Sequence, residues 1–288
     1  MTALLIILAA ESALGQWQPT LPMWRTLIDN CAGSRLVGKN VLVLGPSNLL
    51  GPGTVWMNTG GSVVLAATLR DVVPPGAKLG AYIQRGTPAA CSMSTTSEPW
   101  NLNFGLPLAL PHLSLKLLAA LQRAKFANLS VTAYVVDALD TLKWIHALAS
   151  LPPTNTDYDA IILEGDKMMI ETNAVRVEDL TATFRFRSTA QADLVLKLAS
   201  RPASTTGAGV SLSVSRSGNR TISIRTAPKA APYVVAEFMR LKIPGRLRSR
   251  VRNHALLPIS PASMMLQHIP ATAFSGHLLI LAPAGNQP

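Results

Sequence analysis

Short segments in which apolar and polar residues alternate recur along the chain and predict β-strands. In the clearest of them Ala182, Phe184 and Phe186 alternate with threonine and arginine, from Thr181 to Arg187. A period of two is that of a strand with one face buried. The same alternation occurs over residues 63–69, 129–135, 194–198, 210–214 and 221–225.

Turn-forming residues separate these segments and favour an all-β fold. Ser217–Asn219 lies between the last two segments and predicts a hairpin. Many short strands separated by Gly, Pro, Ser and Asn are typical of sandwiches rather than of parallel α/β sheets. Helical spacing is confined to two segments, about 114–127 and 137–149. The second would be capped by Asp137 or Asp140.

An approximate repeat predicts how the strands are organised. Residues 41–44, 48–50, 62–70 and 77–83 are followed, in the same order, by similar blocks at 160–163, 167–169, 181–187 and 192–198. Identity between the blocks is low, so chance similarity of alternating strands is the alternative. The repeat predicts two tandem β-sandwich modules of jelly-roll type, with one or two short helices in the first. Their expected bounds are 16–152 and 157–288, with the proline-containing segment 151–156 as the boundary.

The beginning of the chain bears on its compartment. Ala3–Ala10 is apolar and Ala13–Gly15 is made of small residues, so residues 1–15 are expected to be a signal peptide. No basic residue precedes the apolar run, and a buried first strand or helix is the alternative. No segment approaches the roughly 20 apolar residues of a membrane span. We therefore expect a secreted or periplasmic protein, in which Cys31 and Cys91 would form one disulfide; the alternative is two buried thiols.

Composition and charge restrict the class of partner. Hydrophobic residues make up 48% and charged residues 14% of the chain, which excludes a disordered protein. The net charge of +11 is compatible with a nucleic acid, an anionic polysaccharide or a membrane surface as partner. The alternative is a cationic protein without a specific anion site. Six basic residues lie between Arg240 and Arg252, without the interleaved aromatics of single-strand binders, so sequence-specific nucleic-acid binding is not expected.

The second half resembles a concanavalin-like sandwich of the laminin-G or glucanase type. The resemblance rests on residues 161–165, 184–187, 194–198, 262–268 and 276–281. Their order is similar to that in domains of the 3-keto-disaccharide hydrolase family. The resemblance implies a protein that binds or processes carbohydrate, although a fold alone does not establish a function.

The catalytic residues of that fold are not carried over. Glucanases place carboxylates on one strand in a Glu-x-Asp-x-x-Glu run. Here Glu164 and Asp166 begin such a run, but Met169 stands where the second glutamate belongs. The five histidines have no metal-ligand spacing, and no nucleophile elbow is present. We therefore expect no catalytic residue, metal site or cofactor.

The candidate ligand-binding residues are two tryptophans and three arginines. Trp56 and Trp100 lie in predicted loops and could stack on a sugar, with packing in the core as the alternative. Arg246, Arg248 and Arg250 could bind an anionic polymer. The expected function is non-catalytic binding of carbohydrate or of a surface by a tandem β-sandwich protein. Two alternatives stay open, a glycoside-processing hydrolase of concanavalin-like fold and a viral or phage structural protein.

Overall fold

The computed structural model describes eleven segments of the chain. They are residues 22–32, 41–47, 51–59, 62–97, 120–121, 123–150, 161–199, 212–226, 231–243, 264–269 and 278–280. The expected leader 1–15, the expected boundary 151–156, Trp100, Arg246, Arg248 and Arg250 lie outside them.

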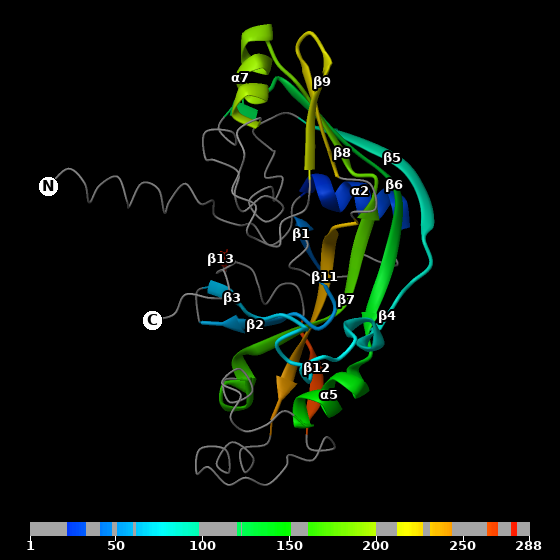
Figure 1. Cartoon of the computed structure of the whole chain (residues 1–288), viewed down its shortest axis with the longest axis vertical. Helices are drawn as coiled ribbons and strands as arrows, with labels where there is room; N and C mark the ends of the chain where they lie inside the picture. Colours follow the sequence, from blue (N-terminus) through cyan, green and yellow to red (C-terminus); the bar gives the residue numbers. More distant parts are fainter. Residues whose placement is uncertain are drawn as a thin grey trace, which may run out of the picture.

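The described strands form one long, curved sheet (Figure 1). In chain order they are β1 (Val41–Ser47), β2 (Val55–Asn58), β3 (Ser62–Ala67), β4 (Ile83–Gln84), β5 (Ala89–Ser97), β6 (Phe126–Leu139), β7 (Met168–Glu178), β8 (Thr181–Arg185), β9 (Leu212–Gly218), β10 (Thr221–Thr226), β11 (Tyr233–Lys242), β12 (Met265–His268) and β13 (Leu278–Ile280). The main order across the sheet is β13-β3-β2-β7-β6-β8-β10-β9. Every pairing is antiparallel except that of β13 with β3.

The long strand β6 pairs with four other strands of this sheet. One edge of β6 pairs with β4 and β5. Along the other edge, the first part of β6 pairs with β8 and the second part pairs with β7. The pairings of β7 and β8 with β6 follow one continuous register, from Ala138↔Asn173 to Phe126↔Arg185. Between β7 and β8, Asp179 has a positive φ of 50°, which aspartate tolerates better than most residues.

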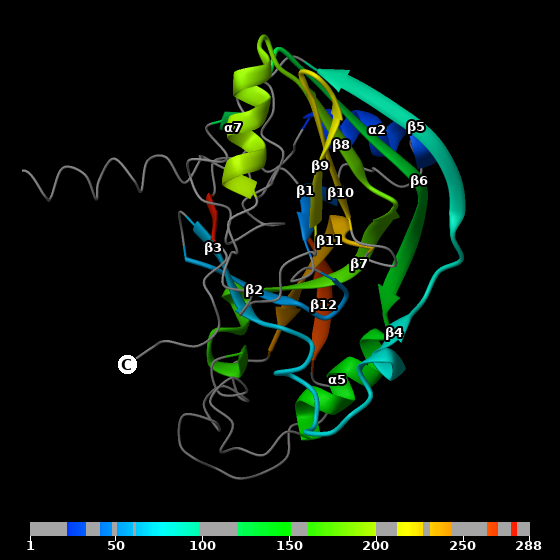
Figure 2. The same cartoon turned by 45° about the horizontal axis from the view of Figure 1, so that its top comes forward.

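In the described part of the chain, helices and 3-10 turns accompany the sheet. The helices are α2 (Pro22–Ala32), α5 (Thr141–Ser150) and α7 (Thr189–Ala199), and the turns are η2 (Leu79–Tyr82) and η4 (Gly165–Lys167). Helix α2 packs on β5 and is joined to it by a disulfide between Cys31 and Cys91. Helices α7 and α5 lie near opposite ends of the sheet (Figures 1 and 2).

Each end of the sheet has its own hydrophobic core. The first core joins α2 and α7 to β6, β8 and β10, and includes Leu27, Leu129, Phe184, Val195 and Ile222. The second surrounds α5 and the beginning of β7, and includes Val55, Trp144, Leu148, Ile170 and Leu241. Burial of large apolar side chains in two clusters lets one long sheet be stabilised along its whole length.

The all-β class and several predicted strands are confirmed. Ala182, Phe184 and Phe186 are buried, and Arg185 between them is exposed. Residues 63–67 and 129–135 lie in β3 and β6. The predicted hairpin is the antiparallel pair β9 and β10, joined through Asn219 and Arg220.

The prediction of a strand at 194–198 is wrong, because these residues belong to α7. The hydroxyl of Ser188 accepts a hydrogen bond from Gln191 N (3.3 Å), which caps the helix at its start. Ala192 and Val195 are buried three positions apart on one helical face, and Leu194 between them is 41% exposed. Leu194, Leu196 and Leu198 alternate with other residues, and this period of two led to the prediction of a strand instead of a helix.

The two predicted helices are only partly observed. The second is α5, and its cap is Asp140, whose Oδ1 accepts a hydrogen bond from Lys143 N (3.1 Å). Asp137 instead belongs to β6. The first was expected over 114–127; of its described residues, Ala120 and Leu121 are helical, but Phe126 and Ala127 begin β6.

The structure does not show two tandem sandwiches. Strands from the two expected modules alternate within one sheet, since β2 pairs with β7 and β1 pairs with β11. Two of the four repeated blocks also differ in structure. Val41–Leu44 is strand whereas residues 161–163 are helical, and residues 77–83 contain η2 whereas 192–198 lie in α7. Apolar and polar residues alternate in both halves because each half contains segments with one buried and one exposed face. The matching blocks do not occupy equivalent positions in the fold.

A pair of neighbouring substitutions tests the assignment of the faces of β8. Phe184 is fully buried, so Phe184→Ala is expected to lower the free energy of unfolding by at least about 3 kcal/mol, through lost burial and the cavity left behind. Arg185→Ala, on the opposite face, should change it by less than about 0.5 kcal/mol. Urea unfolding followed by circular dichroism measures both. Equal losses from the two variants would show that the faces are assigned wrongly.

Candidate functional site

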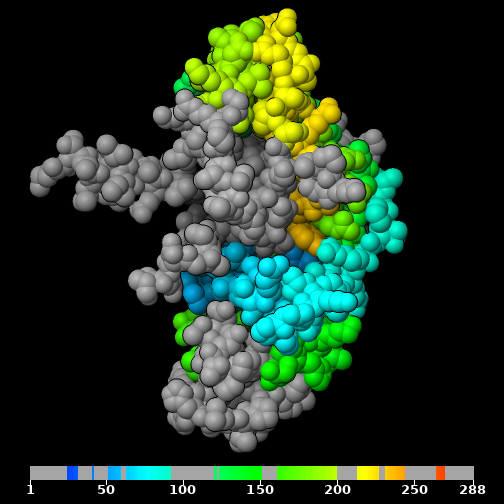
Figure 3. Space-filling model, in the orientation of Figure 1, coloured from blue at the N-terminus to red at the C-terminus, as the bar shows by residue number. Residues whose placement is uncertain are grey.

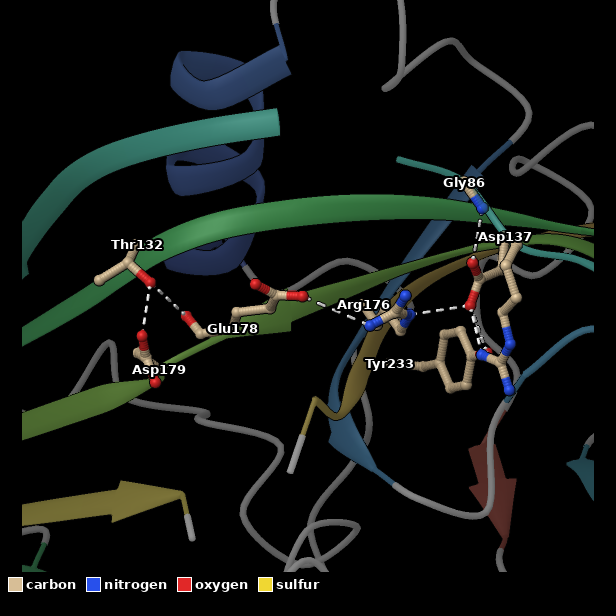
Figure 4. A network of polar contacts seen from close by, with 8 residues as sticks. Gly86, Thr132, Asp137, Arg176, Glu178, Asp179 and Tyr233 are labelled. Atoms are coloured by element: carbon tan, nitrogen blue, oxygen red, sulfur yellow. Dashed lines mark hydrogen bonds and ion pairs between the residues drawn. The ribbon is translucent and has the colours of Figure 1, made fainter. Parts of the chain in front are cut away.

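Among the described residues, the carboxylate of Asp137 accepts hydrogen bonds from four groups (Figure 4). Asp137 has no exposed surface. Its Oδ2 accepts hydrogen bonds from Arg85 Nη1 (2.7 Å), Arg176 Nε (2.9 Å) and the Tyr233 hydroxyl (2.8 Å). Its Oδ1 accepts a fourth from Gly86 N (3.0 Å). One buried carboxylate thus joins three strands and the segment that follows β4.

Strand register brings these partners together from distant parts of the chain. Arg176 on β7 is directly opposite both Val135 on β6 and Tyr233 at the start of β11. Side chains of directly opposite and diagonal residues share a face, so Arg176 reaches Asp137, two residues beyond Val135. The pairing of β4 with the end of β6 brings in Gly86, where a Cβ would collide with the Val136 carbonyl oxygen.

The cluster keeps Asp137 ionised although it is buried. Burial disfavours the charged carboxylate, but hydrogen bonds from Tyr233, Gly86 and the two arginines outweigh it and lower the pKa of Asp137. Burial and the neighbouring carboxylate raise the pKa of Tyr233, which therefore stays protonated and donates. A carboxylate with four donors is a poor base, so this cluster holds the sheet together and is not suited to proton transfer.

The polar contacts continue along β7. Arg176 Nη1 lies 3.5 Å from Glu178 Oε1, and Thr132 Oγ1 donates to Asp179 Oδ2 (2.9 Å) (Figure 4). The Arg85 side chain is 55% exposed and that of Arg176 is 18% exposed, so Arg85 is the more exposed of the two arginines in the cluster.

A second buried carboxyl, Glu171 on β7, has the opposite character. It accepts hydrogen bonds from Gly51 N (2.6 Å) and Trp56 Nε1 (2.9 Å). Burial is the largest influence and outweighs these two bonds, raising the pKa of Glu171 to about 8. With no cation among its described partners, Glu171 is a neutral acid over most of the pH range below 8.

The turn at Gly51 connects the two buried carboxyl groups. Gly51 has a φ of 144°, and a Cβ there would lie 2.8 Å from Tyr233 Cε2. The same residue donates to Glu171, and Tyr233 donates to Asp137. A side chain at this position would displace the Tyr233 ring and would be strained at this φ, so glycine is required here.

The predicted sugar-stacking residue Trp56 lies in the core. Its side chain is 1% exposed and packs edge-to-face on Phe238, with ring centroids 6.3 Å apart. The ring is therefore not available as a stacking surface, and the alternative of core packing is what the structure shows. Trp100, Arg246, Arg248 and Arg250 lie outside the described residues.

The carboxylates that resembled a glucanase motif do not share a strand. Glu164 precedes η4, Asp166 lies in it, and Met169 is buried in β7. Glu164 Oε2 is paired with Lys167 Nζ at 2.7 Å. Within the described segments no group of three or more His, Cys, Asp and Glu side chains could hold a metal ion. Of the helices in the described part of the chain, none has the length and apolarity to cross a membrane.

A concentration of exposed cations at one end of the sheet escaped sequence analysis. Residues 123–130, 181–199 and 212–226 contain eight basic residues and one acidic residue, Asp193, hence a charge of +7. All eight basic residues are exposed, and we call them the cationic end: Arg123, Lys125, Arg185, Arg187, Lys197, Arg216, Arg220 and Arg225. They come from α7, β8, the β9–β10 hairpin and the approach to β6; α7 and the hairpin lie at the top of Figure 3.

Charges elsewhere on the described surface are more often balanced. Around α5 and η4, Lys143 pairs with Asp140 (3.0 Å) and Lys167 pairs with Glu164 (2.7 Å). At the cationic end the one acid, Asp193, pairs with Arg216. The cationic residues are spread over about a hundred positions of the sequence, so no local run of charge could reveal them.

Comparisons with known proteins found similarity only at the level of solved structures. No family model and no curated protein matches it. Among solved structures, a bacterial gasdermin from Bradyrhizobium tropiciagri is similar with a TM-score of 0.42 and 10% sequence identity, over 85% of this chain and 93% of that chain. A TM-score this low supports no conclusion about fold family or function.

The expected resemblance to concanavalin-like sandwiches and to the 3-keto-disaccharide hydrolase family is wrong. No family model of either group matches the chain. Two segments on which the resemblance rested are also not the strands it requires. Residues 161–163 are helical and 194–198 lie in α7.

Proposed function

We propose that this chain is a non-catalytic binding protein that attaches to anionic polymers or surfaces through its cationic end. The observation that carries the proposal is the separation of charge. A charge of +7 lies on the segments that form one end of the sheet, out of +11 for the whole chain. Such a field attracts polyanions and releases their counterions on contact, which favours binding.

The described polar clusters are compatible with a binding role. Asp137 has its oxygens occupied by four donors, and Glu171 is enclosed in the core. Both carboxyl groups hold strands together, so the described buried acids serve the scaffold. The exposed basic side chains of the cationic end are the groups that can contact a binding partner.

We also propose a secreted or periplasmic location. The Cys31–Cys91 disulfide supports it, because stable disulfides form mainly in oxidising compartments. Polyanions exposed outside cells, such as acidic polysaccharides, are accessible to a protein in that location.

Salt-dependent retention on heparin tests the proposed function. The variant Arg185→Ser/Arg187→Ser/Arg220→Ser/Arg225→Ser is expected to elute at a much lower salt concentration than the wild type. Removing four cationic contacts should reduce the slope of log affinity against log salt by about 3–4. All four side chains are exposed, so the fold should be unaffected.

Two further variants make the test specific. Arg70→Ser/Lys78→Ser/Arg240→Ser/Lys242→Ser removes the same charge from exposed positions elsewhere and should elute close to the wild type. Arg246→Ser/Arg248→Ser/Arg250→Ser tests the sequence-based candidates and should also have little effect. Equal losses in all three variants would mean that net charge alone governs retention, and the proposed binding end would be wrong.

A further inference from the structure

Three rows of directly opposed residues cross the strands β6, β8, β10 and β9. They are Phe126–Arg185–Thr221–Gly218, Asn128–Thr183–Ser223–Ser215 and Ser130–Thr181–Arg225–Ser213. Opposed residues of antiparallel strands place their side chains on the same face. We call this the polar face; the four strands lie side by side in Figure 2.

The polar face differs from the other side of the same strands. The alternate residues, among them Leu129, Phe184 and Ile222, are buried in the first core. The polar face instead carries hydroxyl and amide groups, two arginines and one aromatic ring. Of the twelve positions in the three rows none is acidic or aliphatic.

Most of this face can be reached from solvent. Phe126 is 45% exposed, and Arg185, Arg225, Ser213 and Ser215 are exposed as well. The asparagine and the threonines of the rows, with Ser130, are partly exposed. Ser223, at the centre of its row, is buried and does not contribute to the contact surface.

We infer that the ligand of the cationic end is an acidic polysaccharide chain that lies across the polar face. This inference rests on the proposed function and names the ligand of the same end. Serine, threonine and asparagine side chains both donate and accept hydrogen bonds, as sugar hydroxyls do. Arg185 and Arg225 bind carboxylate or sulfate groups, for which the guanidinium geometry is well matched.

The position of Phe126 completes the match. It is directly opposite Arg185, at one corner of the face, where an exposed ring can pack on the apolar side of a sugar. Strands lie about 4.8 Å apart, so each row of four extends about 14 Å, enough to contact several linked sugars. Single-stranded nucleic acids are bound by several interleaved aromatic platforms, whereas these rows carry one aromatic residue.

Calorimetric titration with defined probes tests this ligand. The variant Phe126→Thr/Asn128→Ala/Thr183→Ala keeps every charge and changes only the polar face. With a carboxylated polysaccharide such as polygalacturonate, it should bind at least 10-fold more weakly than the wild type, with an unchanged salt slope. Duplex DNA and anionic phospholipid vesicles should bind more weakly than polygalacturonate. Leu142→Thr/Met265→Thr, which changes exposed apolar residues elsewhere, should bind as the wild type does.

The outcomes separate this inference from the proposed function. If the polar-face variant binds polygalacturonate as the wild type does while the four-arginine variant loses binding, the cationic end stands and the polysaccharide inference is overturned. Tighter binding of duplex DNA or vesicles overturns it as well. If the four-arginine variant loses nothing, the proposed function itself fails. Should the triple variant unfold, Phe126→Thr alone, at an exposed strand end, answers the question.

Discussion

Replacing Asp137 by alanine is expected to lower the free energy of unfolding by about 4–5 kcal/mol. Breaking a buried ion pair by removing one partner typically costs about 3–5 kcal/mol, because the other charge is left uncompensated. Here the loss affects two guanidinium groups, the Tyr233 hydroxyl and Gly86 N at once. Arg176 is the most affected, since its side chain is only 18% exposed.

Asp140 provides a matched control for Asp137. It is another aspartate three positions along, which caps α5 from a more exposed site. Asp140→Ala should cost about 1 kcal/mol, the usual value for a lost N-cap. Urea unfolding of the two variants and the wild type measures the difference. Similar costs for Asp137→Ala and Asp140→Ala would show that the buried cluster contributes no more than an ordinary cap.

The stability of the protein is expected to fall as the pH rises from about 5 to 8 because of Glu171. Its pKa is about 8 in the folded protein and ordinarily 4.5, so in this window the folded state holds a proton that the unfolded state has released. Stability contributed by a raised pKa is complete below the ordinary value and is lost as the pH approaches the folded value. The slope reaches about 1.4 kcal/mol per pH unit, a total of several kcal/mol.

Glu171→Gln isolates this effect, because glutamine keeps the shape and an acceptor for Trp56 Nε1 but does not titrate. Its profile of stability against pH should be nearly flat between 5 and 8. Asp137 cannot imitate the effect, because its lowered pKa makes stability fall only toward acid pH. Glu178→Gln, at a partly exposed site on the same strand, should keep the wild-type profile. The idea fails if Glu171→Gln retains the wild-type slope, whether read by unfolding or by Trp56 fluorescence.

Where one face of a strand is buried, the sequence was sufficient to predict the local structure. Thr181–Arg187 shows this best, because Phe184 and Phe186 cannot both be exposed and the threonines favour extended backbone. Residues 194–198 show the limit. Alternating leucines satisfied the period of a strand, whereas the cap at Ser188 and the burial of Ala192 and Val195 fixed a helix.

The polar clusters and the cationic end depend on pairing that no local pattern contains. The sequence offered Asp137 only as a helix cap, with Asp140 as the alternative, and the partners of Asp137 lie up to 96 positions away. Trp56 had the pattern of a loop residue, but β2 pairs with β7 and places it in the core. Charges scattered from Arg123 to Arg225 become neighbours only when β6, β8, β9 and β10 are placed side by side.

The pairing of β3 with β13 has a consequence for synthesis on the ribosome. Val63 pairs with Leu279, 216 positions later in the chain, and Val41 of β1 pairs with Glu237. Edges of the first strands are therefore without these partners until almost the whole chain has been translated. Unpaired strand edges invite association with other chains. Nascent chains that stall before β11 should thus be retained by chaperones or aggregate, and release of a native molecule should require translation to continue at least through residue 280.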